Sequence, residues 1–224
     1  MSYEEAANVT SLGTTFKGDT TIRLFKELQY FTGITSLDDT FVDCTGLVYV
    51  IIPPTVKTMV RTFKGCSSLI RANIPDVVTE LNRTFSGCKS ISSITTPNSV
   101  VKVDDYTFEE CSKLTSLSFP NSVLSIGKYV VYNCSSLQTI YVGSGVKTIG
   151  DYAFRLAGSS YVQLKSFYCK ATIPPTIGHD IFCLSNIGTA YCPSIYVPHE
   201  AVSSYKNANN WSKYSSGIQG FDFE

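Results

Sequence analysis

The heptapeptide FKGCSSL, residues 63–69, recurs along the chain at a nearly constant spacing. Related segments begin at Phe41 (FVDCTGL), Phe85 (FSGCKSI), Phe108 (FEECSKL) and Val131 (VYNCSSL). Their cysteines stand at positions 44, 66, 88, 111 and 134, in steps of 22 or 23 residues. A period in the range of roughly 20–50 residues is typical of a repeat array. Each repeat of such an array contacts only its neighbours, so the pattern predicts one elongated body.

The rest of each unit has the character of a short strand. From Phe it reads F-x-x-C-x-x-L-x-x-[IVL]-x-[IF]-P-x-x-V-x-x-[IVLM], and Leu117-Ser118-Phe119 alternates apolar and polar residues. This period of two indicates a strand with one buried face. Proline cannot donate to a strand ladder and therefore ends it. Stacking the units places equivalent strands side by side, about 4.8 Å apart, in a parallel sheet with continuous interior ladders of Phe, Leu and Ile.

The pattern resembles the BspA-type leucine-rich repeat family. The resemblance lies in Leu-x-x-Leu-x-Phe at 114–119, followed by Pro-Asn-Ser-Val at 120–123 and again at 97–100, and it covers roughly residues 9–157. It implies a right-handed, curved leucine-rich repeat solenoid with a short-stranded parallel β-sheet and an irregular, turn-rich opposite face. Members of the family are often bacterial surface proteins that act in adhesion and bind host proteins, and others occur in microbial eukaryotes and phage genomes.

The register of the repeats divides the chain into three parts of a single domain. Residues 1–33 are expected to form an N-terminal cap, with a short helical turn at 2–8, and a degenerate first repeat. Residues 34–157 form the regular repeats. Residues 158–224 form irregular final repeats and a C-terminal cap, because Ala157 stands where the next cysteine would be. Within this cap, Pro198 precedes an amphipathic helix candidate at 199–214.

Charge and hydropathy exclude several classes of partner. Lysine plus arginine number 18, as do aspartate plus glutamate, so no basic excess is available for nucleic acid or anionic lipid. No run of 18 apolar residues predicts a membrane span. The first residues, MSYEEAANVTSLG, lack the apolar core of a signal peptide. The protein is therefore expected at the cell surface or secreted if a signal has been removed, and its compartment is otherwise open.

The five repeated cysteines are predicted to be reduced, buried thiols. Equivalent side chains on stacked strands point in parallel, which keeps their Cβ atoms farther apart than the roughly 3.8 Å of a disulfide. Cys183 and Cys192 lie outside this ladder, so a bridge between them stays open. With His179 and His199 they would also supply four zinc ligands, but the spacing matches no known finger.

Nothing else in the sequence predicts catalysis, a cofactor or a metal. The pairs Asp38-Asp39 and Asp104-Asp105 precede the repeat Phe, where turn residues are expected, and we prefer that interpretation to calcium binding. No histidine lies within the repeats, so no nucleophile and base can be assembled there. We therefore expect no catalytic residues, no cofactor and no enzyme.

The outward strand positions remain as the candidate binding surface. Solenoids often bind partners along such rows, and aromatic and arginine side chains commonly anchor interfaces. The candidates are Tyr49, Arg71, Asn73, Tyr141 and Tyr168. The predicted function is a non-catalytic protein- or glycan-binding module, in adhesion or host recognition at a bacterial surface. The alternative is a structural or spacer component of a surface layer or virion.

Overall fold

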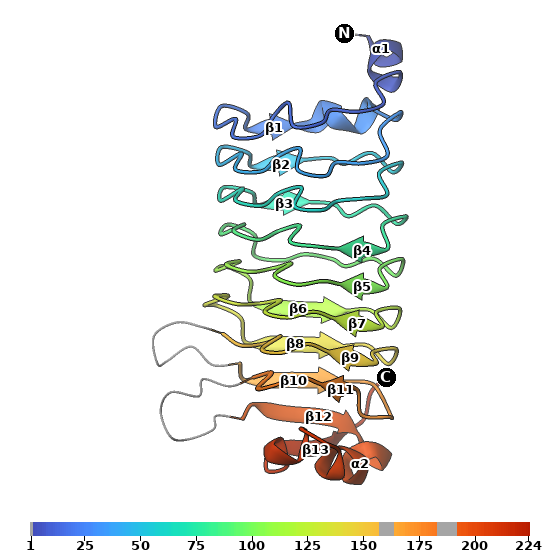
Figure 1. Cartoon of the computed structure of the whole chain (residues 1–224), viewed down its shortest axis with the longest axis vertical. Coiled ribbons are helices and arrows are strands. Elements are labelled where there is room, and N and C mark those ends of the chain that lie inside the picture. The colour runs from blue at the N-terminus through green and yellow to red at the C-terminus, as the bar shows by residue number, and fades with distance from the viewer. Residues whose placement is uncertain (1, 157–163, 183–191) are drawn as a thin grey trace.

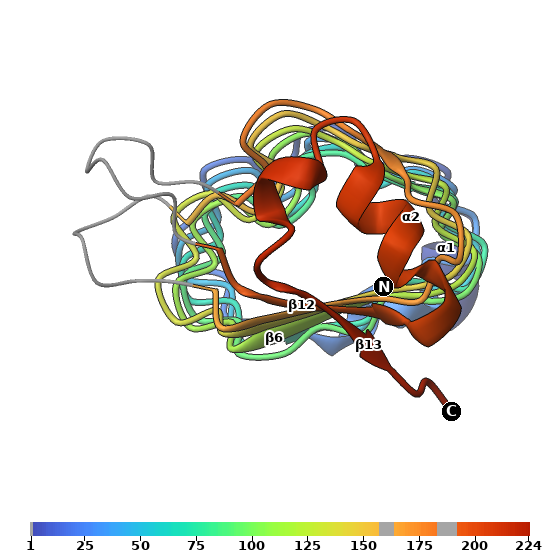
Figure 2. The same ribbon diagram turned by 90° about the horizontal axis from the view of Figure 1, so that it is seen from below.

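The protein is a stack of about eight turns, each laid on the one before (Figure 1). The computed structural model describes residues 2–156, 164–182 and 192–224. The predicted leucine-rich repeat solenoid, its parallel sheet and its short C-terminal helix are confirmed. Viewed along the stack, the turns superimpose as a flattened ring, and the C-terminal helical segments lie across its end (Figure 2).

The main strands pair in parallel with those of neighbouring turns and form two sheets. The first has the order β1-β2-β3 and the second the order β13-β12-β10-β8-β6. The strands are β1 (Leu24–Phe25), β2 (Tyr49–Val50), β3 (Arg71–Ala72), β6 (Ser116–Phe119), β8 (Thr139–Val142), β10 (Ser166–Cys169), β12 (Ser194–Pro198) and β13 (Ile218–Phe221).

A third sheet runs beside these, in a column of its own in Figure 1, with the order β11-β9-β7-β5-β4. Its members are two residues long, because each is bounded by the turns of its repeat: β4 (Glu80–Leu81), β5 (Lys102–Val103), β7 (Ser125–Ile126), β9 (Thr148–Ile149) and β11 (Thr176–Ile177). Each contributes one buried residue to the core.

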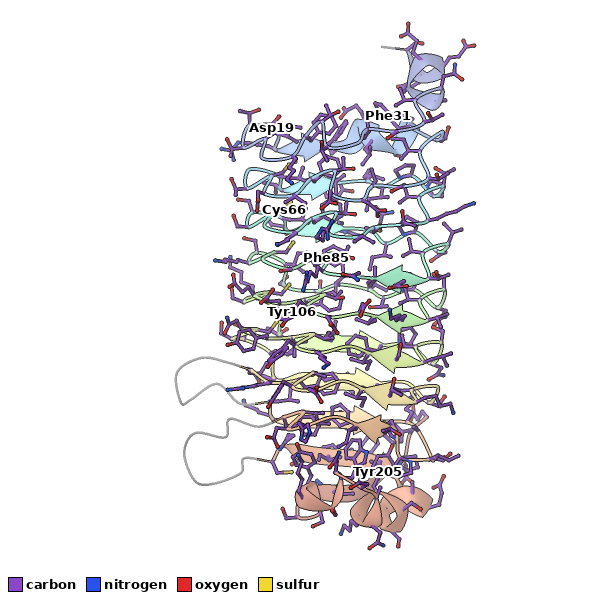
Figure 3. The ribbon with its side chains drawn as sticks, in the orientation of Figure 1. Asp19, Phe31, Cys66, Phe85, Tyr106 and Tyr205 are labelled. Atoms are coloured by element: carbon purple, nitrogen blue, oxygen red, sulfur yellow. The ribbon has the colours of Figure 1, made fainter. Side chains whose placement is uncertain are left out.

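The interior holds the predicted column of phenylalanines. Phe16, Phe41, Phe63, Phe85 and Phe108 lie in successive turns, with ring centroids 5.5, 5.7, 5.7 and 5.8 Å apart and nearly parallel planes. Figure 3 labels Phe85 and the neighbouring Cys66 within the stack. The last four rings are fully buried. Stacked repeats thus share one continuous core, as the spacing of Phe63, Phe85 and Phe108 predicts.

The cysteine ladder is free, buried and hydrogen-bonded. Cys44, Cys66, Cys88, Cys111 and Cys134 are all free thiols with no exposed surface, as predicted. Each donates to the backbone carbonyl of an aromatic residue one turn earlier; Cys66, for example, donates to Phe41 O at 3.0 Å, and Cys134 donates to Phe108 O at 3.0 Å. Burial raises the pKa of Cys88 far above its ordinary value. The ladder therefore links the turns through buried, hydrogen-bonded thiols.

The acidic turn residues also link neighbouring turns. Asp38 Oδ1 accepts from the backbone of Val60 at 2.7 Å, and Asp105 Oδ1 accepts from the backbone of Lys128 at 2.7 Å. The carboxylates occupy a turn position and bond to the next turn, which agrees with the turn interpretation. In the described part of the chain, no three His, Cys, Asp or Glu residues gather as metal ligands.

Both ends of the stack carry helical segments. At the N-terminus, α1 (Tyr3–Ala7) has a capping box between Ser2 and Glu5 and is followed later by the 3₁₀ helix η1 (Lys26–Tyr30). At the C-terminus, the expected single helix over 199–214 is wrong in its length. The segment divides into η2 (His199–Ala201), α2 (Val202–Asn207) and η3 (Ser212–Tyr214). It is interrupted because Ala208 is extended and Asn210 is left-handed, at φ 62°.

The C-terminal cap is held by buried aromatic side chains with satisfied polar atoms. Tyr205, labelled in Figure 3, donates to Ala171 O at 2.9 Å, and Trp211 Nε1 donates to Pro175 O at 2.8 Å. Both residues are fully buried. Among the described residues, no helix has the length and hydropathy of a membrane span.

Candidate binding face

The outward residues of the second sheet form a row of aromatic rings. In β8, β10 and β12, buried and more exposed residues alternate, so every second side chain leaves the core. The parallel register places Tyr141 beside Tyr168 and Tyr168 beside Tyr196. Their ring centroids are 4.7 and 4.5 Å apart, with interplanar angles of 14° and 10°. The strand spacing itself thus stacks the rings, because in-register parallel strands lie about 4.8 Å apart.

We call Tyr141, Tyr168, Tyr196 and Phe221 the aromatic row. Phe221 in β13 meets Tyr168 and Tyr196 edge-on, at 5.2 and 5.5 Å between centroids. Burial raises the pKa of Tyr168 above its ordinary value, with neighbouring tyrosines adding to the effect. The Tyr168 hydroxyl therefore remains a neutral hydrogen-bonding group across the physiological range.

The row ends at Tyr141, because the paired residue in β6 is Ser118. Tyr141 is 44% exposed. A small hollow of about 230 Å³ opens at this end, lined among others by Ser118, Tyr141 and Lys170. Lys170 Nζ donates to the backbone oxygen of Glu224 at 3.0 Å and lies 5.7 Å from the ring centroid of Phe223. An aromatic surface, small hydroxyl groups and a lysine therefore meet at one place.

The other sequence candidates lie in the first sheet. Tyr49 in β2 pairs with Arg71 in β3, and both line an open groove of about 870 Å³, as does Asn73. Arg71 is exposed and forms no ion pair with a described residue. The Asn73 amide bonds to the Ile52 backbone, accepting from Ile52 N at 2.8 Å and donating to Ile52 O at 3.0 Å. Asn73 thus extends the β2–β3 pairing with its side chain.

The five candidates form two groups. The structure brings Tyr141 against Tyr168, and it gathers Tyr49, Arg71 and Asn73 around the groove. The groups belong to different sheets, and Asn98 lines both hollows. Sequence reasoning missed Tyr196, although Ser194-Ile195-Tyr196-Val197 has the same alternation as the β8 segment. It also missed Phe221, since the terminal segment lacks the repeat pattern.

The two histidines make separate contacts with aspartates. His199 Nε2 lies 3.3 Å from Asp222 Oδ1, and the His179 backbone donates to Asp151 Oδ1 at 2.9 Å. Cys192 donates to Pro193 O at 3.4 Å. Cys183 lies outside the described residues, so its bridge to Cys192 and its place in a zinc site are untested.

The chain is similar to leucine-rich repeat proteins of bacteria in known structure. That of T. pallidum has 27% identity and a TM-score of 0.57, with 65% of this chain and 67% of that chain covered. A leucine-rich cell surface protein of Faecalibacterium prausnitzii has 23% identity and a TM-score of 0.57, over 72% of this chain and 43% of that chain. One from Bacteroides ovatus has 18% identity and a TM-score of 0.50, covering 84% and 63%.

The latter two likenesses concern the fold alone, and this chain spans less than half of the F. prausnitzii protein. No curated protein sequence gives a significant match. The family model for the BspA type leucine-rich repeat region, by contrast, matches residues 34–159 and 81–205, with six copies. These residues include the Cys ladder, Phe41 to Phe108 of the phenylalanine column, and the strands β8, β10 and β12. The chain therefore belongs to the BspA-type leucine-rich repeat family.

Proposed function

We propose that this chain is a non-catalytic binding module that recognises a protein or glycan partner at a bacterial surface. The observation that carries the proposal is the aromatic row, which lies on the outward side of a rigid sheet. Tyrosine supplies large contact areas and is enriched among interface residues of high energetic weight. The rings are already held by stacking, so binding would order few additional side chains.

The surroundings of the row support contact with a partner. Tyr141 and Phe221 are 44% and 39% exposed although both are large and apolar in part. In β6 the residue paired with Tyr141 is Ser118, whose small hydroxyl side chain leaves room beside the Tyr141 ring. The family includes surface proteins, and the F. prausnitzii relative is described as a cell surface protein.

A binding screen tests the proposal. The purified chain would be applied to immobilised extracellular-matrix proteins, mucins and a glycan array at physiological salt. Any saturable ligand would then be measured with Tyr141→Ala and Tyr49→Ala. Truncating an anchoring tyrosine is expected to weaken binding by more than about 1 kcal/mol. Unchanged affinity in Tyr141→Ala would contradict binding by the aromatic row, and unchanged affinity in both variants would contradict binding by either group of candidates.

Tyr106→Ala is a matched control. Tyr106 stacks on Tyr129 at 5.3 Å and carries Arg83 at 5.0 Å over its ring, so it loses comparable packing when truncated. Tyr106 lies outside the main strands, at a turn position where its φ is 57°. Its truncation should leave binding unchanged. A folded sample that binds nothing in the screen would count against a recognition role and in favour of the spacer alternative.

A further inference from the structure

The ladder of main strands is broken at one turn. Residues 91–97, at the main-strand position of their repeat, contain no strand. β3 pairs only with β2, and β6 pairs only with β8. All of these residues lie in the described part of the chain, and no backbone hydrogen bond joins 92–96 to 70–74 or to 115–119.

The sequence of this turn explains the break. The inward positions of 92–96 are Ile94 and Thr96, where β6 has Leu117 and Phe119. Ile94 is only partly buried, so the segment has less apolar surface holding it to the core. Its remaining residues, Ser92, Ser93 and Thr95, are exposed and add no apolar surface to the core.

The groove described above enters the sheet at this break. Its walls include outward residues such as Arg71 and Ser93, and also inward residues such as Ala72, Ile94 and Thr96. The lining spans β2, β3 and the 92–96 segment, so the groove lies across the break. Its walls carry the unpaired N–H and C=O groups of the β3 edge, and such an edge is a template for another strand.

Thr96 is a second, independent sign of a ligand. It is 8% exposed, and its hydroxyl has no hydrogen-bond partner in the described structure. The hydroxyl groups of three other buried threonines are hydrogen-bonded: those of Thr62, Thr84 and Thr107 donate to backbone carbonyls at 3.0, 2.8 and 3.0 Å. A buried hydroxyl without a partner has lost its hydrogen bonds to water without compensation, so a ligand group that bonds to it would gain affinity.

We propose that this groove binds an extended polypeptide segment, which adds as a strand to the free edge of β3. The proposal deepens the proposed function, on which it rests, by naming the ligand and a second site. Backbone groups of the added segment would bond to the β3 edge, and alternate side chains would enter toward Ala72 and Ile94. The Thr96 hydroxyl would bond to the inner side of the added segment.

A polypeptide fits these walls better than a glycan does. The unpaired groups alternate as N–H and C=O along an extended chain, and another backbone matches that order. Tyr49 is the one aromatic residue lining the groove. The charged lining residues, Arg71 and Asp76, have opposite signs, which suits a segment with both kinds of charge.

The test begins with a displayed library of random linear peptides, selected on the folded full chain. Enriched peptides would be synthesised with and without N-methylation at alternate residues. N-methylation should weaken binding about tenfold, because it removes the backbone donors. Thr96→Val should weaken peptide binding several-fold. Valine can occupy this inward position without disturbing the core, since Val142 holds the corresponding position in β8. Ser93→Trp, at an exposed wall position, gives a second block that leaves the core unchanged.

Hydrogen exchange locates the site independently. Amides of 92–96 should exchange rapidly in the free protein and become protected with the peptide, whereas amides of β8 stay protected throughout. No enriched peptide, or binding that tolerates N-methylation and both variants, would overturn the proposal. Peptides that depend on Tyr141 but not on Thr96 would overturn it while supporting the aromatic row. Glycan binding that Ser93→Trp abolishes would also overturn it.

Discussion

The phenylalanine column allows one prediction to be worked out in detail. Phe85 and Phe108 occupy the same repeat position, and both are fully buried. Phe85 stacks between two rings, Phe63 at 5.7 Å and Phe108 at 5.8 Å, with interplanar angles of 23° and 1°. Phe108 has a ring in the column on one side only, because Val131 replaces phenylalanine in the next turn. Comparing variants at Phe85 and Phe108 therefore distinguishes the contribution of ring stacking from that of burial.

We expect Phe85→Leu to destabilise the protein more than Phe108→Leu. Both variants lose a similar apolar volume and leave a similar cavity. An aromatic pair contributes about 0.5–1.5 kcal/mol beyond its buried area, and Phe85→Leu removes two pairs where Phe108→Leu removes one. The difference in the free energy of unfolding should therefore be about 0.5–1.5 kcal/mol.

Urea denaturation measures this difference. Far-UV circular dichroism follows the whole stack, and the fluorescence of Trp211, the single tryptophan, follows the C-terminal cap. Coincidence of the two transitions would justify a two-state fit, which repeat arrays do not always obey. Equal losses in the two variants, or a larger loss in Phe108→Leu, would refute the stacking argument.

Three further predictions concern side chains that link the turns. Thr84→Val should lower the free energy of unfolding by about 1–2 kcal/mol in urea denaturation, because it removes a buried hydrogen bond. Thr96→Val should leave the free energy of unfolding equal or higher, because the Thr96 hydroxyl has no partner to lose. A larger loss in Thr96→Val than in Thr84→Val would contradict this difference in hydrogen bonding. Burial raises the pKa of Cys88, so a thiol reagent at pH 8 should modify it at least about tenfold faster after unfolding. Rapid labelling of native Cys88 would count against the buried ladder.

The third is a pH dependence. The hydrogen bond from Arg61 lowers the pKa of Asp39, and this contribution is present above the unfolded pKa of about 3.9 and is lost as pH falls through the folded value. Asp39→Asn should cost less than about 1 kcal/mol at pH 7 and nothing near pH 2. A cost that persists in acid would show that the ion pair is not its cause.

The sequence predicts the repeated part of the fold well, because each turn repeats the same local solution. Phe63, Phe85 and Phe108 fall in one column, and the five ladder cysteines are buried and free, as their constant spacing requires. Prediction was weaker where the repeat ends. The segment after Pro198 breaks at Ala208 and Asn210, and β13 has no signal that resembles the other strands.

The candidate site was predicted only in part. Period-two alternation correctly gives the outward direction of Tyr141 and Tyr168, and the register of the sheet then brings their rings together. The same alternation does not show that Asn73 bonds to the Ile52 backbone, since that contact depends on where the next turn lies. The binding role of the five candidates remains a proposal.

The sequence by itself determined the family, the parallel stack and the composition of its core, since a period of 22 or 23 residues permits each apolar position to meet only its own equivalents. Only the tertiary structure decided where the sheet is interrupted. At the two inward positions, the 92–96 segment has Ile94 and Thr96 where β6 has Leu117 and Phe119, and whether a strand forms depends on how these side chains pack against both neighbouring turns. That balance opens the groove at Thr96 and separates it from the aromatic row.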